Sequence, residues 1–310
     1  MADFTDFSFA SSTGKNTIRA RKIVPDGEVK AVVQIAHGIA EHIERYDDFM
    51  RFLADNGCVV VGNDHLGHGK SAKTEKEKGA FASKDGWNAV VKDMVKLHDI
   101  MIQEYPGVKY VMFGHSMGSF LTRTYLIDYP GKYDAAIISG TGHQSPALII
   151  GGNLIADLLI KMNGYMSDGQ KLNDIAFGSY LSKIENPRTP FDWLTKEDSV
   201  VDRYIEDPMC GFVAKTGLYG DMMKGIKYIT SEKNMDRMDK TKPVYFMSGK
   251  DDPVGDYGKG VEKAYDCFKK VKMQDVMIRL YDEGRHEMLN ETNKEKVYED
   301  ILNWLKEKVF

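Results

Sequence analysis

The sequence predicts an α/β fold with a mostly parallel central sheet flanked by helices and an inserted helical cap. Short apolar runs alternate along the chain with segments of helical periodicity, which is typical of strand–helix–strand units. Residues 141–240 show helical but no strand patterning, and this stretch is too long to be a simple connection. We therefore expect a core domain made of residues 1–140 and 241–310, and a cap made of residues 141–240.

The N-terminal part of the chain predicts a hairpin followed by three buried strands. Residues 4–24 alternate loosely between polar and apolar around a turn at 12–16, which favours a hairpin. The runs 30–36, 58–62 and 109–113 are almost continuously apolar, as strands buried on both faces of a parallel sheet are. Helical patterns begin near Arg45, with Gly57 as a stop signal, and cover residues 85–104.

The remaining elements complete the sheet and close the chain. Strands are predicted at 135–138, 243–247 and 276–280, and an amphipathic helix is predicted at 293–308. The most apolar stretch, 146–161, is predicted not to span a membrane. Gly151, Gly152 and Asp157 should interrupt it well short of the ~20 residues that a spanning helix needs.

The composition is that of an ordinary globular protein. With 310 residues, 42% of them hydrophobic, the chain is long enough for one large domain with an insertion. A formal net charge of −4 argues against a nucleic-acid partner, which usually requires a basic face. Cys58, Cys210 and Cys267 are far apart and form neither a zinc motif nor a disulfide framework. Because the N-terminus also lacks a signal-peptide pattern, we expect a cytoplasmic location.

The most informative segment reads Gly-His-Ser-Met-Gly at residues 114–118. It lies between a predicted strand and a helix-compatible run, which is the setting of a nucleophile elbow. The glycines leave room for a strained turn that exposes the Ser116 hydroxyl. The serine then lies at a helix N-terminus, which favours a developing negative charge. Glycine is common enough that the pattern alone is weak, so a base, an acid and a second oxyanion donor are also required.

Two loops after later strands supply the candidate base and acid. His286 follows the last predicted strand, and catalytic groups of α/β proteins belong at the carboxyl ends of strands. Asp252 follows the preceding strand, and Pro253 favours an extended conformation for it. The neighbouring Asp251 is the alternative acid. Serine, acid and histidine thus occur in the chain order that the nucleophile elbow requires, and the acid would orient the imidazole.

The loop after the first parallel strand supplies a candidate oxyanion donor. Gly38 permits an unusual turn there, and the backbone N–H of Ile39 would point at the oxyanion. The backbone N–H of Met117, directly after the serine, would be its partner. Each such donor is typically worth about 10²–10³ in rate.

Several segments together resemble a known family. They are His37–His42 with Arg45 and Tyr46, Asn63–Ser71, Gly114–Gly118, Thr189–Leu194, Asp252–Val254, and His286 with Glu287. This set, which spans about residues 30–290, is similar to the monoacylglycerol lipase and bacterial lysophospholipase-like family of the α/β-hydrolase superfamily.

The resemblance implies an α/β-hydrolase fold and a serine hydrolase that cleaves esters of monoacylglycerol or lysophospholipid type. It also implies residues that brace the oxyanion loop without a direct chemical part, namely Glu41, His42, Arg45, Asp64 and His65. No dinucleotide-binding, phosphate-binding or His-Glu-x-x-His motif is present in the sequence. We therefore expect neither a cofactor nor a metal.

The cap is rich in side chains suited to an acyl chain. They are Phe177, Tyr180, Phe191, Trp193, Tyr204, Met209, Phe212, Tyr219, Met222 and Met223. Ligand pockets are largely apolar, so a subset should face Ser116, while most should fill the core of the cap itself. The expected partner is a small acyl ester, with transient contact between the cap and a membrane surface. The sequence predicts no oligomeric state.

Two other functions stay open at this stage. The same triad could cleave amides, as in proline-iminopeptidase-like relatives, if an acid anchored the substrate amine. Candidate anchors in the cap are Glu197, Asp198, Asp202 and Glu206, although surface solvation explains them more simply. The chain could also be a catalytically silent binding protein on this fold, but no member of the candidate triad is missing from the sequence.

Overall fold

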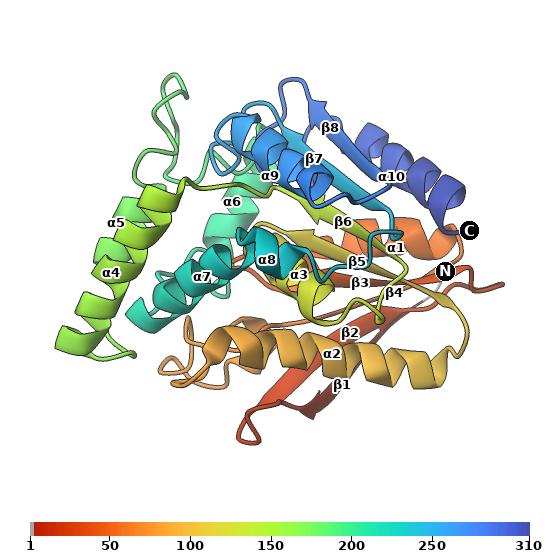
Figure 1. Ribbon diagram of the computed structural model, residues 1–310, viewed down its shortest axis with the longest axis horizontal. Coiled ribbons are helices and arrows are strands. Elements are labelled where there is room, and N and C mark those ends of the chain that lie inside the picture. Colours follow the sequence, from red (N-terminus) through yellow and green to blue (C-terminus); the bar gives the residue numbers. More distant parts are fainter. Residues whose placement is uncertain (1–2) are drawn as a thin grey trace.

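The computed structural model describes residues 3–310, which build an eight-stranded sheet at the centre of the molecule (Figure 1). The strands are β1 (Phe4–Ala10), β2 (Thr17–Ile23), β3 (Ala31–Ala36), β4 (Cys58–Asn63), β5 (Lys109–His115), β6 (Ala135–Ser139), β7 (Val244–Gly249) and β8 (Val276–Tyr281). Their order is β1-β2-β4-β3-β5-β6-β7-β8. Only β2 runs in the direction opposite to the other seven strands, so the prediction of a mostly parallel sheet is confirmed.

Helices cover both faces of this sheet. On one face lie α1 (Asp47–Asp55), which follows a short 3-10 turn at Ile43–Tyr46, and α10 (Lys294–Lys308). On the other lie α2 (Gly86–Glu104), α3 (Met117–Asp128) and α9 (Lys259–Lys270). The sequence analysis did not predict α9. Its buried apolar side chains are only Val261, Ala264 and Phe268, a narrow stripe among charged residues.

The residues of β3 show why the parallel strands are almost continuously apolar. Val32 and Ala36 enter the apolar core on one face, while Val33 and Ile35 enter the core on the other. The register of the sheet then positions the candidate site. Ala36 pairs with Gly114 and His115 pairs with Ser139, so the loops after β3, β5 and β6 meet at the same edge. This is the edge where ligand sites of parallel sheets form.

Five helices lie between β6 and β7. They are α4 (Pro146–Asn163), α5 (Gln170–Phe177), α6 (Asp198–Glu206), α7 (Thr216–Ile229) and α8 (Glu232–Met235). Helix α7 packs against α2 and α3 of the core, and α4 packs against α7. Helices α4 and α5 lie at the end of the molecule away from both termini (Figure 1). The boundaries proposed above for the core and the cap stay a prediction.

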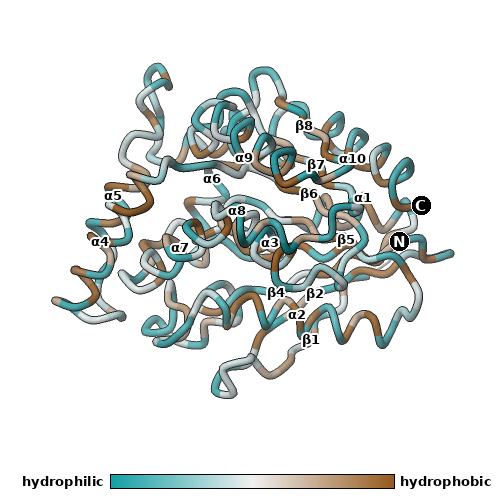
Figure 2. The backbone as a smooth tube through the Cα atoms, viewed as in Figure 1, coloured by the Kyte–Doolittle hydropathy of each residue, from teal (hydrophilic) through white to brown (hydrophobic). Residues whose placement is uncertain are grey.

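The expected interruption of the apolar stretch in the cap is wrong. Helix α4 runs unbroken for 18 residues through Gly151, Gly152 and Asp157. Gly152 packs closely against the Met223 side chain of α7, and a Cβ there would approach the Met223 methyl to 2.4 Å. Asp157 lies on the surface and forms an ion pair with Lys224. By length and composition alone α4 is apolar enough to cross a membrane, and hydrophobic segments recur along it (Figure 2). Only 11% of this helix is buried.

Candidate active site

The Gly-His-Ser-Met-Gly segment forms a strained turn between β5 and α3. Ser116 has φ 54° and ψ −123°, a backbone conformation that an L-residue adopts only when its surroundings enforce it. Its N–H donates to the Ser139 carbonyl of the neighbouring strand at 3.0 Å. A Cβ on Gly118 would come within 2.0 Å of the Ala36 carbonyl oxygen, so only glycine fits there. The turn leaves Ser116 at the wall of a cavity, directly before α3.

Asp252 and His286 form a buried pair beside this turn. The Nδ1 atom of His286 lies 3.0 Å from each carboxylate oxygen of Asp252. Asp252 also accepts hydrogen bonds from the Ser248 hydroxyl at 2.8 Å and from the Val254 N–H at 2.9 Å. Asp251 instead lies on the surface and pairs with Lys196. Of the two candidate acids, Asp252 is therefore the one that contacts His286.

Burial and ion pairing shift the pKa values of His286 and Asp252 in opposite directions. Burial lowers the pKa of His286, but the Asp252 carboxylate outweighs it and holds that pKa above its ordinary value. Burial likewise raises the pKa of Asp252, yet the charge of His286 and the hydrogen bonds keep that pKa below its usual range. Asp252 is therefore ionised at neutral pH and fixes the His286 proton on Nδ1. The imidazole then presents its unprotonated Nε2 as a base.

The loop after β3 lies against Ser116, as predicted. A Cβ on Gly38 would lie 3.1 Å from the Ser116 Cβ, so the loop approaches the serine closely because residue 38 is glycine. Ile39 lines the same cavity as Ser116. Met117 is the first residue of α3, so its N–H has no acceptor within the helix. Both candidate oxyanion donors thus lie next to Ser116.

A buried histidine holds this loop in place. His37 bonds to the Gly38 carbonyl through Nδ1 at 2.7 Å and accepts the His65 N–H on Nε2 at 3.0 Å. Burial keeps the pKa of His37 well below its ordinary value, so it is neutral and this pattern is fixed. Asp64 accepts the backbone N–H groups of Ile43 and Lys70 at 2.9 and 2.8 Å. Asp64 and His65, two of the bracing residues that the resemblance implied, therefore contact the loop or the segment that follows it.

Arg45 links the oxyanion loop to the base. Its guanidinium forms two parallel hydrogen bonds with Glu287 at 2.6 and 2.7 Å, and it also pairs with Glu41. Glu41 in turn accepts the Gly38 N–H. The cap joins this network because the Tyr204 hydroxyl donates to the Ala40 carbonyl at 2.9 Å. No sequence motif indicated these roles of Glu287 and Tyr204. The hydrogen bond by which Ser248 supports Asp252 was not predicted either.

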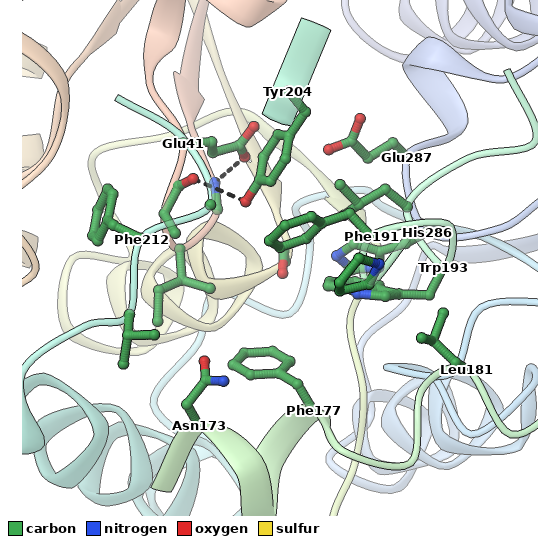
Figure 3. Close-up of a pocket in the computed structure, with 18 of the residues that line it drawn as sticks. Glu41, Asn173, Phe177, Leu181, Phe191, Trp193, Tyr204, Phe212, His286 and Glu287 are labelled. Carbon is green, nitrogen blue, oxygen red and sulfur yellow. Dashed lines mark hydrogen bonds between the residues drawn. The ribbon is translucent and has the colours of Figure 1, made fainter. Parts of the chain in front are cut away.

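The site opens into a cavity of about 280 Å³ between the sheet edge and the cap (Figure 3). Six of the predicted cap side chains line it, namely Phe177, Phe191, Trp193, Tyr204, Phe212 and Tyr219. Tyr180 packs on Trp193, while Met222 and Met223 pack against the main core. The rings of Trp193 and His115 lie 5.1 and 4.6 Å from that of His286 and cover it. The cavity thus has a largely apolar lining that is rich in aromatic side chains, which suits an acyl group.

One cluster outside the cavity offers metal-ligand atoms. His42, Asp207 and Cys210 each contribute one such atom, and these lie within 4.8 Å of one another. The His42 ring already bonds to Asp207 at 2.8 Å, so two of the three groups have a hydrogen-bond partner and need no metal ion. Burial raises the pKa of the Cys210 thiol, so it is protonated at neutral pH. All three cysteines of the chain are free thiols.

Comparison with known proteins identifies the family of this chain. Residues 27–293 match the family described as serine aminopeptidase, S33. The chain belongs to that family. It is 26% identical over 289 residues to a monoacylglycerol lipase of Mycolicibacterium smegmatis, covering 91% of this chain and 90% of the relative. It is also 25% identical over 290 residues to human monoglyceride lipase, covering 92% and 85%.

Among solved structures, a highly thermostable carboxyl esterase from Bacillus coagulans in complex with glycerol superposes with a TM-score of 0.92. The two chains are 28% identical, and the match covers 100% of each. Together with the family match, this similarity confirms the predicted α/β-hydrolase fold and the resemblance drawn from the motifs.

Proposed function

We propose that this protein is a serine hydrolase of carboxylic esters. Ser116 would attack the ester carbonyl while His286 takes its proton on Nε2, and Asp252 would stabilise the resulting imidazolium. The N–H groups of Ile39 and Met117 would bind the oxyanion. His286 would then protonate the departing alcohol, and water would hydrolyse the acyl-enzyme by the reverse sequence of proton transfers. The observation that carries this proposal is the buried Asp252–His286 pair beside the strained Ser116 turn.

The charges around the cavity favour esters over aminoacyl amides. An aminopeptidase needs an unpaired carboxylate to hold the substrate ammonium group. Glu41 and Glu287 do line the cavity, but Arg45 pairs with both. Within residues 3–310, the four predicted cap acids do not line the cavity, and Asp198 and Asp202 pair with Arg188. Asp174 does line it, but this carboxylate is exposed to solvent at the rim and accepts a hydrogen bond from Gln170 at 2.6 Å. A neutral acyl group therefore fits this site better than an aminoacyl group, whose ammonium would find no unpaired carboxylate deep in the cavity.

The names of the relatives narrow the substrate class. Two of them are named monoacylglycerol or monoglyceride lipase, and the aromatic cavity suits an acyl chain. We therefore propose a monoacylglycerol or lysophospholipid-like ester as the substrate. A cytoplasmic location remains part of this proposal, supported by the three free thiols.

Rates on matched substrates test this proposal. The purified protein is assayed with a monoacylglycerol, a lysophospholipid and an aminoacyl amide, and Ser116→Ala is assayed beside it. We expect hydrolysis of at least one ester, a lower rate on the amide, and loss of ester hydrolysis in Ser116→Ala. An amide rate above both ester rates would favour the aminopeptidase alternative, and ester hydrolysis that survives Ser116→Ala would refute the proposal.

We also propose that α4 contacts the membrane surface that presents such esters. Leu148, Leu154, Leu158 and Met162 of α4 are each more than half exposed, an unusual concentration of large apolar side chains. We expect Leu154→Glu with Leu158→Glu to weaken co-sedimentation with phospholipid vesicles. Met277→Glu, at an exposed apolar position on β8, is the control. Equal sedimentation of the three proteins would contradict this contact.

A further inference from the structure

One polar side chain stands out at the cap end of the aromatic cavity. Asn173 of α5 lines the cavity together with Phe177, Leu181 and Phe212. Figure 3 shows Asn173 and Phe177 at one end of the cavity, with Glu41 and Glu287 at the other. Asn173 is half-buried, whereas its neighbour Asp174 is exposed at the rim. An amide group therefore faces the part of the cavity that is otherwise suited to hydrocarbon.

The orientation of this amide is fixed by Tyr219. The Tyr219 hydroxyl lies 2.9 Å from the Asn173 Oδ1 atom. The hydroxyl is the donor in this hydrogen bond, because an amide oxygen can only accept. The Tyr219 proton must therefore go to the Asn173 oxygen. The NH₂ group of Asn173, with its two donors, is the side of the amide left to face the cavity.

The geometry of the reaction assigns this end of the cavity to the acyl chain. The departing alcohol must reach His286, which lies beside Trp193 and away from Asn173 (Figure 3). The carbonyl oxygen must point to the N–H groups of Ile39 and Met117. The acyl chain attached to the same carbon therefore extends away from His286, towards α5. Its far end is the part of the substrate that meets Asn173.

We propose that Asn173 is a specificity-determining residue that limits the length of the acyl chain, an inference that rests on the proposed ester hydrolysis. A chain that ends before Asn173 leaves the amide hydrogens free to bind water. A longer chain covers them with methylene groups, which accept no hydrogen bond. Leaving buried donors unpaired is costly, so kcat/KM should fall about 10-fold or more at the first chain length that reaches Asn173.

A chain-length series tests this limit. Straight-chain monoacylglycerols of increasing length are assayed with the wild type, Asn173→Leu and Asn173→Ala, and kcat/KM of each is divided by that for the shortest ester. In the wild type we expect the abrupt fall. In both variants the fall should move to longer chains or vanish. Tyr219→Phe, which frees the amide to turn, should make the fall shallower.

Asn303→Leu is the matched control, because Asn303 is exposed on α10, away from α4, and does not line the cavity. Its profile should superimpose on that of the wild type. Superposition of the Asn173→Leu and Asn173→Ala profiles on that of the wild type would overturn the role of Asn173 while leaving ester hydrolysis intact. Absence of any hydrolysis that depends on Ser116 would overturn both proposals.

Discussion

Replacing Asp252 with asparagine tests how His286 is oriented and protonated without removing the histidine itself. The carboxylate has one oxygen bound to the Ser248 hydroxyl and the other to the Val254 N–H, and both lie 3.0 Å from His286 Nδ1. In the variant, the Val254 N–H keeps the amide oxygen beside it, so the NH₂ group takes the place near Ser248. The Ser248 hydroxyl can rotate to accept from it. His286 Nδ1 then faces an amide donor as well as the amide oxygen, and accepting from that donor favours the tautomer without a proton on Nδ1.

That change moves the imidazole proton to Nε2, the atom that has to accept the serine proton. In a serine protease triad the same replacement lowers kcat by about 10⁴-fold. We expect a loss of 10³-fold or more here, about 4 kcal/mol or more of barrier. Asparagine has nearly the same shape, so the thermal midpoint should shift by only a few degrees.

Asp251→Asn is the matched control for this experiment. It removes only a surface ion pair with Lys196, which is worth about 1 kcal/mol at most. Its kcat for ester hydrolysis should stay within about 2-fold of the wild-type value. If Asp251→Asn lost activity and Asp252→Asn kept it, the assignment of the acid and the reasoning from the tautomer would both be refuted.

Three further predictions concern the ionisable side chains His286, Asp221 and Arg45. Because Asp252 holds the pKa of His286 above its ordinary value, kcat/KM should fall as the pH drops through a midpoint above ~6.5, and a flat profile from pH 5 to 7.5 would contradict this. Burial raises the pKa of Asp221 to about 6, so the folded protein binds a proton there more tightly than the unfolded chain does. The resulting contribution to the free energy of unfolding is complete below pH ~4 and is lost as the pH rises through 6. Asp221→Asn, which keeps an acceptor for Tyr165, should therefore exceed the wild type in thermal midpoint at pH 8 but match it near pH 4, and an equal difference at both pH values would exclude this cause. Arg45→Met should lower the free energy of unfolding in urea by about 3–5 kcal/mol because Glu41 and Glu287 stay buried and unpaired, and a change below about 1 kcal/mol would argue against the network.

Local patterns made much of the fold and of the candidate site predictable. The six parallel strands are short, mostly apolar runs, and Ser116, Asp252 and His286 each lie in the turn or loop after one of them. The carboxyl ends of parallel strands meet at one edge, so three separate loops could be placed together before any contact was known. The choice of Asp252 over Asp251 rested on a single proline, and the contact with His286 now supports it.

What the sequence did not reveal depends on contacts between distant residues. Arg45 and Glu287 are 242 positions apart, so no spacing could predict their pairing. The continuity of α4 depends on Gly152 packing against Met223, a contact that makes a glycine useful inside a helix. The role of Asn173 likewise appears only once Tyr219 is seen to hold its oxygen. Sequence patterns show which residues follow a strand, but only the packed structure shows which partners they find.

The central claim is that Ser116 is a nucleophile activated by His286 and Asp252. A fluorophosphonate probe followed by peptide mass spectrometry tests it most directly, because such probes bond covalently to an activated serine. We predict one labelled peptide containing Ser116, with labelling abolished in Ser116→Ala and strongly slowed in Asp252→Asn. Labelling at another serine, or none in the folded wild-type protein, would contradict the account.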